Sequence, residues 1–394
     1  MHLGLLYSSV LAALAVTSWL IVPWLWTLAQ VFGALWLLSL VARYITEELL
    51  ALRGAQHVDC RGKAVLITGC DSGFGLELAV RLHNRGVRVF AGCLMPDSQG
   101  ANRLRALASE VGEGKGSVHV LAPMDVTSDS QVQDAVKQVT KILTSEGAPA
   151  QQHENGIAQP EDDGVGEVPQ LWAMVANAGV ICASELEWGS LEPLSRMMEV
   201  NAVGVARSVR AFLPMVRRAK GGRVVICTSL WSHFAIPFSV GYCMSKCAAR
   251  FFADGLRREM RKFGVRVVSI EPNMYATNLT SDSILVPAMD KQWQESSDLV
   301  RRDYGQAYYE LCRQWLRRGL ANESRTEVHE VVDAMESAVL AHKPRSVYRP
   351  DGLFRAVQWR LLGISSPALQ DALLAKRAQP PVTTMPGSRG IARG

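Results

Sequence analysis

The sequence predicts an α/β fold with a doubly wound parallel sheet, preceded by an N-terminal membrane anchor. Two observations predict the sheet. Strand-like apolar runs alternate with helical patterns from residue 63 onward, and a glycine-rich turn directly follows the first run. The anchor is predicted because no Asp, Glu, Lys or Arg occurs between Leu3 and Ala42. With 394 residues and 48% hydrophobic content, the chain can bury a large core, which excludes a disordered, fibrous or disulfide-framework protein.

The uncharged N-terminal stretch is longer than one membrane pass requires. As a helix, its roughly forty residues would extend ~60 Å, about twice the ~30 Å thickness of the hydrocarbon layer. Pro23 lies in its middle. We therefore predict an anchor over residues 1–45 made of two short transmembrane helices, with a single pass plus an interfacial segment as the alternative. Positive charge after the apolar run favours the cytoplasmic side, and it is carried here by Arg43, Arg53, Arg61 and Lys63.

Six apolar runs after the anchor have the length and composition of buried strands. Helical patterns separate them, which is typical of a parallel sheet. We assign them to one domain over residues 60–350. The predicted strands cover residues 63–68, 87–93, 118–124, 171–176, 223–228 and 265–271.

Three segments depart from this alternation. Residues 147–169 contain Gly, Pro, Gln and five acidic residues but no Lys or Arg, and they are interpreted as a flexible acidic insertion. Residues 351–376 include an apolar stretch that either packs as a C-terminal helix or docks on a membrane surface. Residues 377–394 form a short polar tail, predicted to be disordered.

The glycine-rich turn lies between the first strand and the first helix of the domain. Glycines at such a turn allow the backbone to approach a pyrophosphate, which the helix N-terminus then stabilises. A glycine trio alone is weak evidence, and the strand–turn–helix context strengthens the dinucleotide interpretation. The turn contains Thr68, Gly69, Asp71, Ser72, Gly73, Phe74 and Gly75.

A second group of chemically relevant residues is Ser229, Tyr242 and Lys246. Tyr242 and Lys246 are four residues apart, so on a helix their side chains lie on the same face. A nearby ammonium lowers the pKa of a phenol, so the tyrosine could exchange a proton near neutral pH. Ser229 follows a predicted strand, at the sheet edge where α/β proteins bind ligands. Alone, a Tyr-x3-Lys pair is most often a surface feature, but here it accompanies the glycine turn.

Over residues 60–350 the chain resembles the classical short-chain dehydrogenases/reductases, which implies a Rossmann-type sheet. Besides the glycine turn and the Ser/Tyr/Lys set, the resemblance rests on Asp125, Asn177-Ala178-Gly179, Asn201, Pro272 and Thr277. Phrases such as TGCDSGFG, VFAGCL and RRDYGQAYY look like the branch containing hydroxysteroid, retinol and D-3-hydroxybutyrate dehydrogenases.

The resemblance implies a role for each matching residue. Tyr242 would be the general acid/base, Lys246 would lower its pKa and hold the nicotinamide ribose, and Ser229 would orient the substrate oxygen. Asn201 would support a proton-relay water. The implied cofactor-binding residues are Thr68, Gly69, Asp71, Ser72, Gly73, Phe74, Gly75, Asp125, Val126, Asn177, Ala178, Gly179, Tyr242, Lys246, Pro272 and Thr277.

Two departures from the family pattern bear on activity and cofactor. Asn273 replaces the glycine expected after Pro272, which weakens the inference of activity, although Asn tolerates unusual backbone angles. No acidic residue ends the second strand, where a ribose-binding Asp often marks NAD. A 2′-phosphate would favour a basic residue, whereas the turn offers Asp71. We therefore predict NAD rather than NADP, and oxidation of an alcohol as the working direction.

Aromatic residues are concentrated where the substrate is expected. Residues 281–320 occupy the position of the family's substrate lid and include Trp293, Tyr304, Tyr308, Tyr309 and Trp315. The stretch between Ser229 and Tyr242 could line an apolar cleft or belong to the core. It contains Trp231, Phe234, Ile236, Pro237 and Phe238.

Composition narrows the partners. Short basic clusters balanced by acids, with no nucleic-acid motif, indicate no nucleic-acid partner at a net charge of +5. The eight cysteines and eight histidines show no metal-ligand spacing, so we expect reduced thiols and no metal. The expected partners are a lipophilic substrate and membrane lipid, and a homodimer is compatible with the sequence.

The sequence therefore predicts a membrane-anchored, NAD-dependent dehydrogenase that oxidises an alcohol on a steroid or retinoid, with the domain on the cytosolic side of the endoplasmic reticulum. A dehydrogenase of a small hydroxy acid such as 3-hydroxybutyrate is one alternative, and a catalytically silent cofactor-binding scaffold is another. Glycan on the sequons at Asn278 or Asn322 would contradict the cytosolic assignment.

Overall fold

The computed structural model of the chain divides into two units, Met1–Gln56 and His57–Gly394. It describes residues 57–109, 114–145, 169–351 and 361–378, with residues 24–39 and isolated positions at 9, 10, 12, 17, 18, 22, 42, 46 and 358. Residues 24–39 are helical. Within the described part of the chain, no helix is both long and apolar enough to cross a membrane.

Several predicted segments lie mostly outside the described residues. These are the first predicted membrane pass, the acidic insertion up to residue 168 and the polar tail beyond residue 378. Their predicted properties remain predictions. Part of the predicted C-terminal segment is described, and it forms the helix α13 (Pro367–Ala378).

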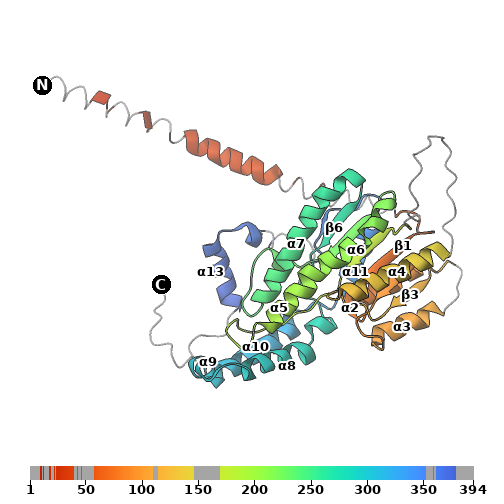
Figure 1. Cartoon of the computed structure of the whole chain (residues 1–394). Coiled ribbons are helices and arrows are strands. Elements are labelled where there is room, and N and C mark those ends of the chain that lie inside the picture. The colour runs from red at the N-terminus through yellow and green to blue at the C-terminus, as the bar shows by residue number, and fades with distance from the viewer. Residues whose placement is uncertain are drawn as a thin grey trace. The chain divides into compact units, whose positions relative to one another are not determined.

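The second unit is built on a parallel sheet of seven strands in the order β3-β2-β1-β4-β5-β6-β7 (Figure 1). This confirms the predicted α/β fold with a doubly wound sheet. Each of the six predicted runs contains a strand, and β7 is an addition. The strands are β1 (Ala64–Thr68), β2 (Arg88–Gly92), β3 (Val118–Leu121), β4 (Ala173–Ala176), β5 (Arg223–Cys227), β6 (Arg266–Ile270) and β7 (Val347–Tyr348).

Helices cover both faces of the sheet, which explains why its strands are apolar on both sides. Alternate residues of β1 point to opposite faces. Val65 and Ile67 pack against α2 (Gly73–Asn84), α3 (Gln99–Ala108) and α11 (Val328–Leu340). Ala64 and Leu66 pack against a second layer, which consists of α4 (Asp129–Ser145), α6 (Gly204–Arg218) and α7 (Val240–Met260).

The strand order reverses between β1 and β4, so the chain leaves their carboxyl ends in opposite directions. In open α/β sheets the crevice at this point binds ligands. The helix after β4 begins as α5 (Glu192–Met198), passes through a π-helical turn at Glu199–Val203 and continues as α6. Such turns are frequent at functional sites.

The predicted lid forms three helices between β6 and α11. They are α8 (Asp282–Gln294), α9 (Asp298–Tyr304) and α10 (Gln306–Glu323), and α8 and α10 lie together at one end of the domain in Figure 1. Leu362 and Leu374 of the C-terminal segment pack against Leu230 and Phe234. Part of this segment therefore packs on the domain, as one of the two sequence interpretations predicts.

Candidate active site

A cavity of about 300 Å³ lies at the carboxyl ends of the central strands. It brings together residues from the turn after β1 and from the segments after β3, β4, β5 and β6. Of the predicted site residues, those lining it are Gly69, Asp71, Ser72, Gly73, Phe74, Asp125, Val126, Asn177, Ala178, Gly179, Tyr242, Lys246, Pro272 and Thr277. The other four, Thr68, Gly75, Asn201 and Ser229, do not line it, and their contacts are described below.

The glycine turn after β1 is packed too closely to accept side chains. Gly69 has φ +71°, and a Cβ on it would lie 2.8 Å from Ala178 Cα. A Cβ on Gly75 would lie 2.4 Å from the carbonyl oxygen of Gly69 and 2.5 Å from Asn177 Nδ2. The glycines thus bring the first turn of α2 against the loop after β4.

Thr68 and Asn177 fasten the turn to the loop after β4. The hydroxyl of Thr68 accepts the backbone N–H groups of Asn177 and Ala178, each at 3.1 Å. Asn177 Nδ2 donates to the carbonyl oxygens of Thr68 at 3.0 Å and Gly69 at 3.1 Å. The carboxyl ends of β1 and β4 are thereby held together at the switch point.

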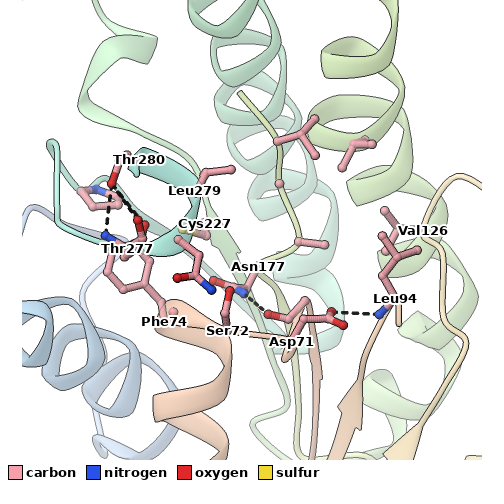
Figure 2. A pocket seen from close by; sticks show the side chains of 18 of the residues that line it. Asp71, Ser72, Phe74, Leu94, Val126, Asn177, Cys227, Thr277, Leu279 and Thr280 are labelled. Carbon is pink, nitrogen blue, oxygen red and sulfur yellow. Dashed lines mark hydrogen bonds between the residues drawn. The ribbon is translucent and has the colours of Figure 1, made fainter. Parts of the chain in front are cut away.

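Asp71 reaches the end of β2 (Figure 2). Its carboxylate accepts the backbone N–H groups of Leu94, at 2.9 Å, and Met95, at 3.0 Å. The position after β2, which carries no acid of its own in sequence, therefore holds a carboxylate supplied by the glycine turn. Both N–H donors at that position are engaged by this carboxylate.

Asp125, after β3, is fixed by three contacts. It accepts the backbone N–H of Thr127 at 2.9 Å and its hydroxyl at 2.8 Å, and it lies 3.6 Å from the Arg196 guanidinium. Burial alone would raise its pKa, but these hydrogen bonds and Arg196 hold the pKa of the Asp125 carboxyl below its usual range. It is therefore an ionised acceptor at neutral pH.

Tyr242 and Lys246 lie on one face of α7 with Ser229 beside them. The Lys246 ammonium is 5.8 Å from the Tyr242 ring centroid and donates to the Cys227 carbonyl at 2.9 Å. Burial raises the pKa of Tyr242, and a hydrogen bond with Ser229 acts in the opposite direction. Burial also lowers the pKa of Lys246. The lowered phenol pKa expected from the Tyr-x3-Lys spacing is thus not found, because burial outweighs the lowering effect of the Ser229 hydrogen bond.

Asn201 is fully buried in the π-helical turn. Its Oδ1 accepts the Val180 N–H at 2.8 Å, and its Nδ2 donates to the Val180 carbonyl at 2.8 Å and to Ser245 Oγ at 2.9 Å. Both ends of the amide are engaged in joining the loop after β4 to α7. Gly179 lies close to this side chain and to that of Lys246, since a Cβ on it would lie 3.2 Å from Asn201 Oδ1 and 3.4 Å from Lys246 Nζ.

The segment after β6 carries the unexpected Asn273. No positive φ occurs at this residue, so it has no backbone need for glycine. Its Nδ2 donates to Asp351 Oδ2 at 3.0 Å. Further along, Thr277 forms a capping box with Thr280, whose hydroxyl accepts the Thr277 N–H at 3.1 Å (Figure 2).

Several lining residues were not predicted. Leu94, just after β2, could have been found from its position at a strand end. Arg196 on α5 carries no local sequence signal, since only the fold brings it to Asp125. The remaining unpredicted residues that line the cavity are Met124, Val180, Val200, Cys227, Thr228, Asn273, Tyr275, Asn278, Leu279, Thr280 and Ile284.

A second cavity, of about 480 Å³, adjoins the first at Asn273. All five residues of the 231–238 stretch singled out from the sequence line it, which favours the cleft over the core interpretation. Lid and C-terminal residues complete it. Its lining consists of Ala183, Trp231, Phe234, Ile236, Pro237, Phe238, Ser239, Asn273, Met274, Trp315, Leu316, Gly319, Leu320, Asn322, Glu323, Gln358 and Leu374.

The lid is held by an aromatic cluster centred on Trp188. The ring of Trp188 lies within 4.9 to 6.4 Å of five other aromatic rings. Phe238 belongs to both the cluster and the second cavity and has φ 63°, a rare angle for a bulky residue. The five neighbouring rings are Phe238, Trp293, Tyr304, Tyr308 and Tyr309.

Comparison with known proteins identifies the family. Residues 63–145 and 152–284 match the short chain dehydrogenase family. The chain belongs to this family. It is accordingly an NAD(P)-dependent dehydrogenase of the short-chain type.

Similar proteins include relatives with different named substrates. D-beta-hydroxybutyrate dehydrogenase, mitochondrial, of Rattus norvegicus is 35% identical over 73% of this chain and 77% of its own length. 17-beta-hydroxysteroid dehydrogenase type 6 of Homo sapiens is 34% identical over 73% of this chain and 80% of its own length. Retinol dehydrogenase 16 of Mus musculus is 32% identical over 80% of this chain and 88% of its own length.

Solved structures support the fold. A short chain dehydrogenase/reductase from Burkholderia phymatum in complex with NAD has a TM-score of 0.58 at 18% identity, and covers 82% of this chain and 99% of its own. A short chain dehydrogenase from Burkholderia cenocepacia in complex with NADP has a TM-score of 0.52 at 21% identity, and covers 80% of this chain and 99% of its own.

The residues of the first cavity fit a nicotinamide dinucleotide. Gly69 and Gly73 of the glycine turn line the cavity with backbone alone, and the turn opens the helix α2, whose N-terminus favours a pyrophosphate. Asp125 supplies a fixed acceptor at one end of the cavity, and Tyr242 and Lys246 supply polar groups at another part of its wall. We call this cavity the cofactor cleft and the second the substrate cavity.

Proposed function

We propose that the protein oxidises a hydroxyl group on a lipophilic substrate, a steroid or retinoid, to the carbonyl with NAD. The substrate cavity carries this proposal. Its volume of about 480 Å³ lies within the range of small-molecule sites, and most of its lining is aromatic or aliphatic. It meets the cofactor cleft at Asn273, and Trp231 of its lining packs edge-on against Tyr242 at 5.9 Å between ring centroids.

The chemistry follows from the groups beside this junction. Bound NAD supplies the hydride acceptor. Tyr242 would release its own proton to solvent and then, as the phenolate, take the hydroxyl proton of the substrate, while Ser229, which hydrogen-bonds with Tyr242, would orient the substrate oxygen. Lys246 lies beside Tyr242 and provides positive charge that favours the phenolate when the proton leaves the tyrosine. Cys227 holds the ammonium in place through its carbonyl.

A small hydroxy acid is the alternative substrate, supported by the similarity to D-beta-hydroxybutyrate dehydrogenase. A carboxylate substrate calls for a cation, best an Arg that can bind it through two hydrogen bonds. Within the described part of the chain no Lys, Arg or His lines the substrate cavity, whereas Glu323 does. The charge of the cavity therefore favours a neutral substrate.

The test is turnover by the full-length protein in detergent or vesicles, with NAD, of estradiol, testosterone, retinol and D-3-hydroxybutyrate. We expect kcat/KM for the best steroid or retinoid to exceed that for hydroxybutyrate at least about a hundredfold. Preferred turnover of hydroxybutyrate would refute the lipophilic assignment. Cofactor binding without turnover of any alcohol would refute the proposed reaction and favour the scaffold interpretation.

Asp71 supports the choice of NAD over NADP. Because its carboxylate occupies the two N–H donors after β2, a 2′-phosphate there would meet negative charge and lack these donors. Replacing Asp71 with Ser is expected to raise kcat/KM for NADP relative to NAD by about tenfold or more. Initial rates with each cofactor measure this ratio. An unchanged ratio would show that Asp71 does not determine the preference.

We further propose that the N-terminal segment anchors the protein in the endoplasmic reticulum with the second unit in the cytosol. The uncharged residues 3–42 support the anchor. Asn278 supports the cytosolic side, because it lines the cofactor cleft and a glycan there would obstruct it. Carbonate extraction of microsomes should leave the full-length protein in the membrane pellet, and endoglycosidase should not change its mobility. Release by carbonate would contradict the anchor, and a mobility shift would contradict the orientation.

A further inference from the structure

Asn273 lies at the junction of the cofactor cleft and the substrate cavity. Among the residues that the structure describes, it alone lines both. A hydride passing between a substrate and a nicotinamide must cross from one cavity to the other. Residue 273 therefore borders the passage that the reacting atoms need.

The side chain of Asn273 is held in one orientation by Asp351. The hydrogen bond from Asn273 Nδ2 to Asp351 Oδ2 measures 3.0 Å, and only 3% of Asp351 is exposed. A hydrogen bond to a carboxylate is stronger than one between neutral groups, and burial shields it from water. The NH₂ end of the amide is directed at Asp351, and this bond holds the side chain in one orientation at the edge of the junction.

The hydrogen bond between Asn273 and Asp351 also connects the junction to the end of the lid. Asp351 Oδ1 lies 3.9 Å from the Arg325 guanidinium, two residues beyond α10. Arg325 is joined to the segment after β6 by its backbone, which donates to Met274 at 3.0 Å and accepts from Ala276 at 2.8 Å. Its guanidinium also pairs with Glu330 at 2.5 Å. Asp351 is thus fixed independently of Asn273.

We propose that Asn273 determines substrate specificity by limiting the width of the passage between cofactor and substrate, with Asp351 as the positioning residue. The inference rests on the proposed function in one respect, the placement of the substrate in the second cavity. The selected class is alcohols in which at least one carbon beside the carbinol carbon is unbranched or flat, so that this side can pass Asn273. A branch on this side would meet the amide of Asn273 before the carbinol reached the cofactor cleft.

The test compares two alcohols that differ only in this respect. One is the best substrate of the wild type in the panel above. The other is its analogue with one methyl group added to the carbon beside the carbinol. We expect N273G to raise the kcat/KM ratio of branched to unbranched alcohol about tenfold, since a methyl group in an apolar site changes discrimination by roughly that factor or more. N273S, which keeps a small polar group, is expected to give a smaller rise.

Two further variants separate positioning from size. N273D keeps the size of the side chain but places two carboxylates together, so the side chain should leave its position and the ratio should rise. The double variant N273D/D351N exchanges donor and acceptor across the same contact and should restore the wild-type ratio. Q133A, which shortens an exposed side chain on α4 outside both cavities, should leave the ratio within about twofold of wild type.

Each other outcome overturns the proposal. An unchanged ratio in N273G and N273S, with both alcohols slowed equally, would assign Asn273 a structural role only. A raised KM for NAD with an unchanged ratio would make it a cofactor contact. Failure of the double variant to restore the ratio would remove Asp351 as the positioning residue. A hydroxy acid as best substrate would refute the proposed function; its methyl-branched analogue then completes the pair, and an unchanged ratio in N273G would refute the present proposal separately.

Discussion

Replacing Tyr242 with phenylalanine is expected to lower kcat/KM about a thousandfold, within the range that a positioned acid or base contributes. The change removes one oxygen atom and keeps the ring, which packs edge-on against Trp231 at 5.9 Å between centroids. Lys246 keeps its bond to the Cys227 carbonyl. The loss should therefore fall on kcat, with the KM for NAD changed less than about threefold. Steady-state rates on the best substrate measure both.

The matched control is Tyr304→Phe, which also removes a single phenolic oxygen. Tyr304 lies on α9 and donates to Glu187 at 3.0 Å, outside the cofactor cleft and the substrate cavity. We expect it to retain most of the wild-type kcat/KM. If Tyr242→Phe kept more than about a tenth of wild-type kcat/KM, Tyr242 would not be the acid/base. If both variants lost activity equally, the loss would reflect packing.

The strands and the first site residues are predictable because their signals are local. Each buried strand of the parallel sheet is a continuous apolar run, and the glycine turn directly follows the first of them. β7 consists of only Val347 and Tyr348, too short to show any periodicity. Asp125, Asn177 and Pro272 were implied by the family resemblance, and they meet in one cavity because the carboxyl ends of parallel strands share one edge of the sheet.

The parts of the site that were not predicted depend on tertiary packing. Arg196 reaches Asp125 only because α5 follows the strand next to β1. Gln358 and Leu374 line the substrate cavity although they lie more than a hundred residues after Tyr242. The pKa of Tyr242 depends on its burial, and helical spacing between Tyr and Lys carries no information on burial. Sequence thus locates groups along strands and helices, while the fold determines their surroundings.

Gly75→Ala and Gly255→Ala are expected to change stability in opposite directions, although both place an alanine inside a helix. At Gly75 the new Cβ would lie 2.4 Å from the Gly69 carbonyl oxygen, which cannot move without shifting backbone. It would also lie 2.5 Å from Asn177 Nδ2, which hydrogen bonds to the Thr68 and Gly69 carbonyls hold in place. Overpacking of this kind costs about 1–3 kcal/mol of unfolding free energy. At Gly255, in α7, a Cβ would meet nothing within 4 Å, so alanine should stabilise the protein by about 0.5–1 kcal/mol.

Comparing Gly75→Ala with Gly255→Ala also distinguishes a displaced glycine turn from a general loss of stability. Moving the glycine turn away from Asn177 also displaces the cradle for the pyrophosphate, and a displacement of about 1 Å can cost on the order of a hundredfold. Gly75→Ala should therefore weaken NAD binding by about that factor at a temperature where the protein is still folded, whereas Gly255→Ala should leave the Kd unchanged. Thermal unfolding and NAD titration measure the two effects. The contacts that place Gly75 beside Asn177 leave no room for a side chain, so Gly75→Ala must displace the turn. Normal NAD affinity in this variant would therefore show that the cofactor is not bound against the turn.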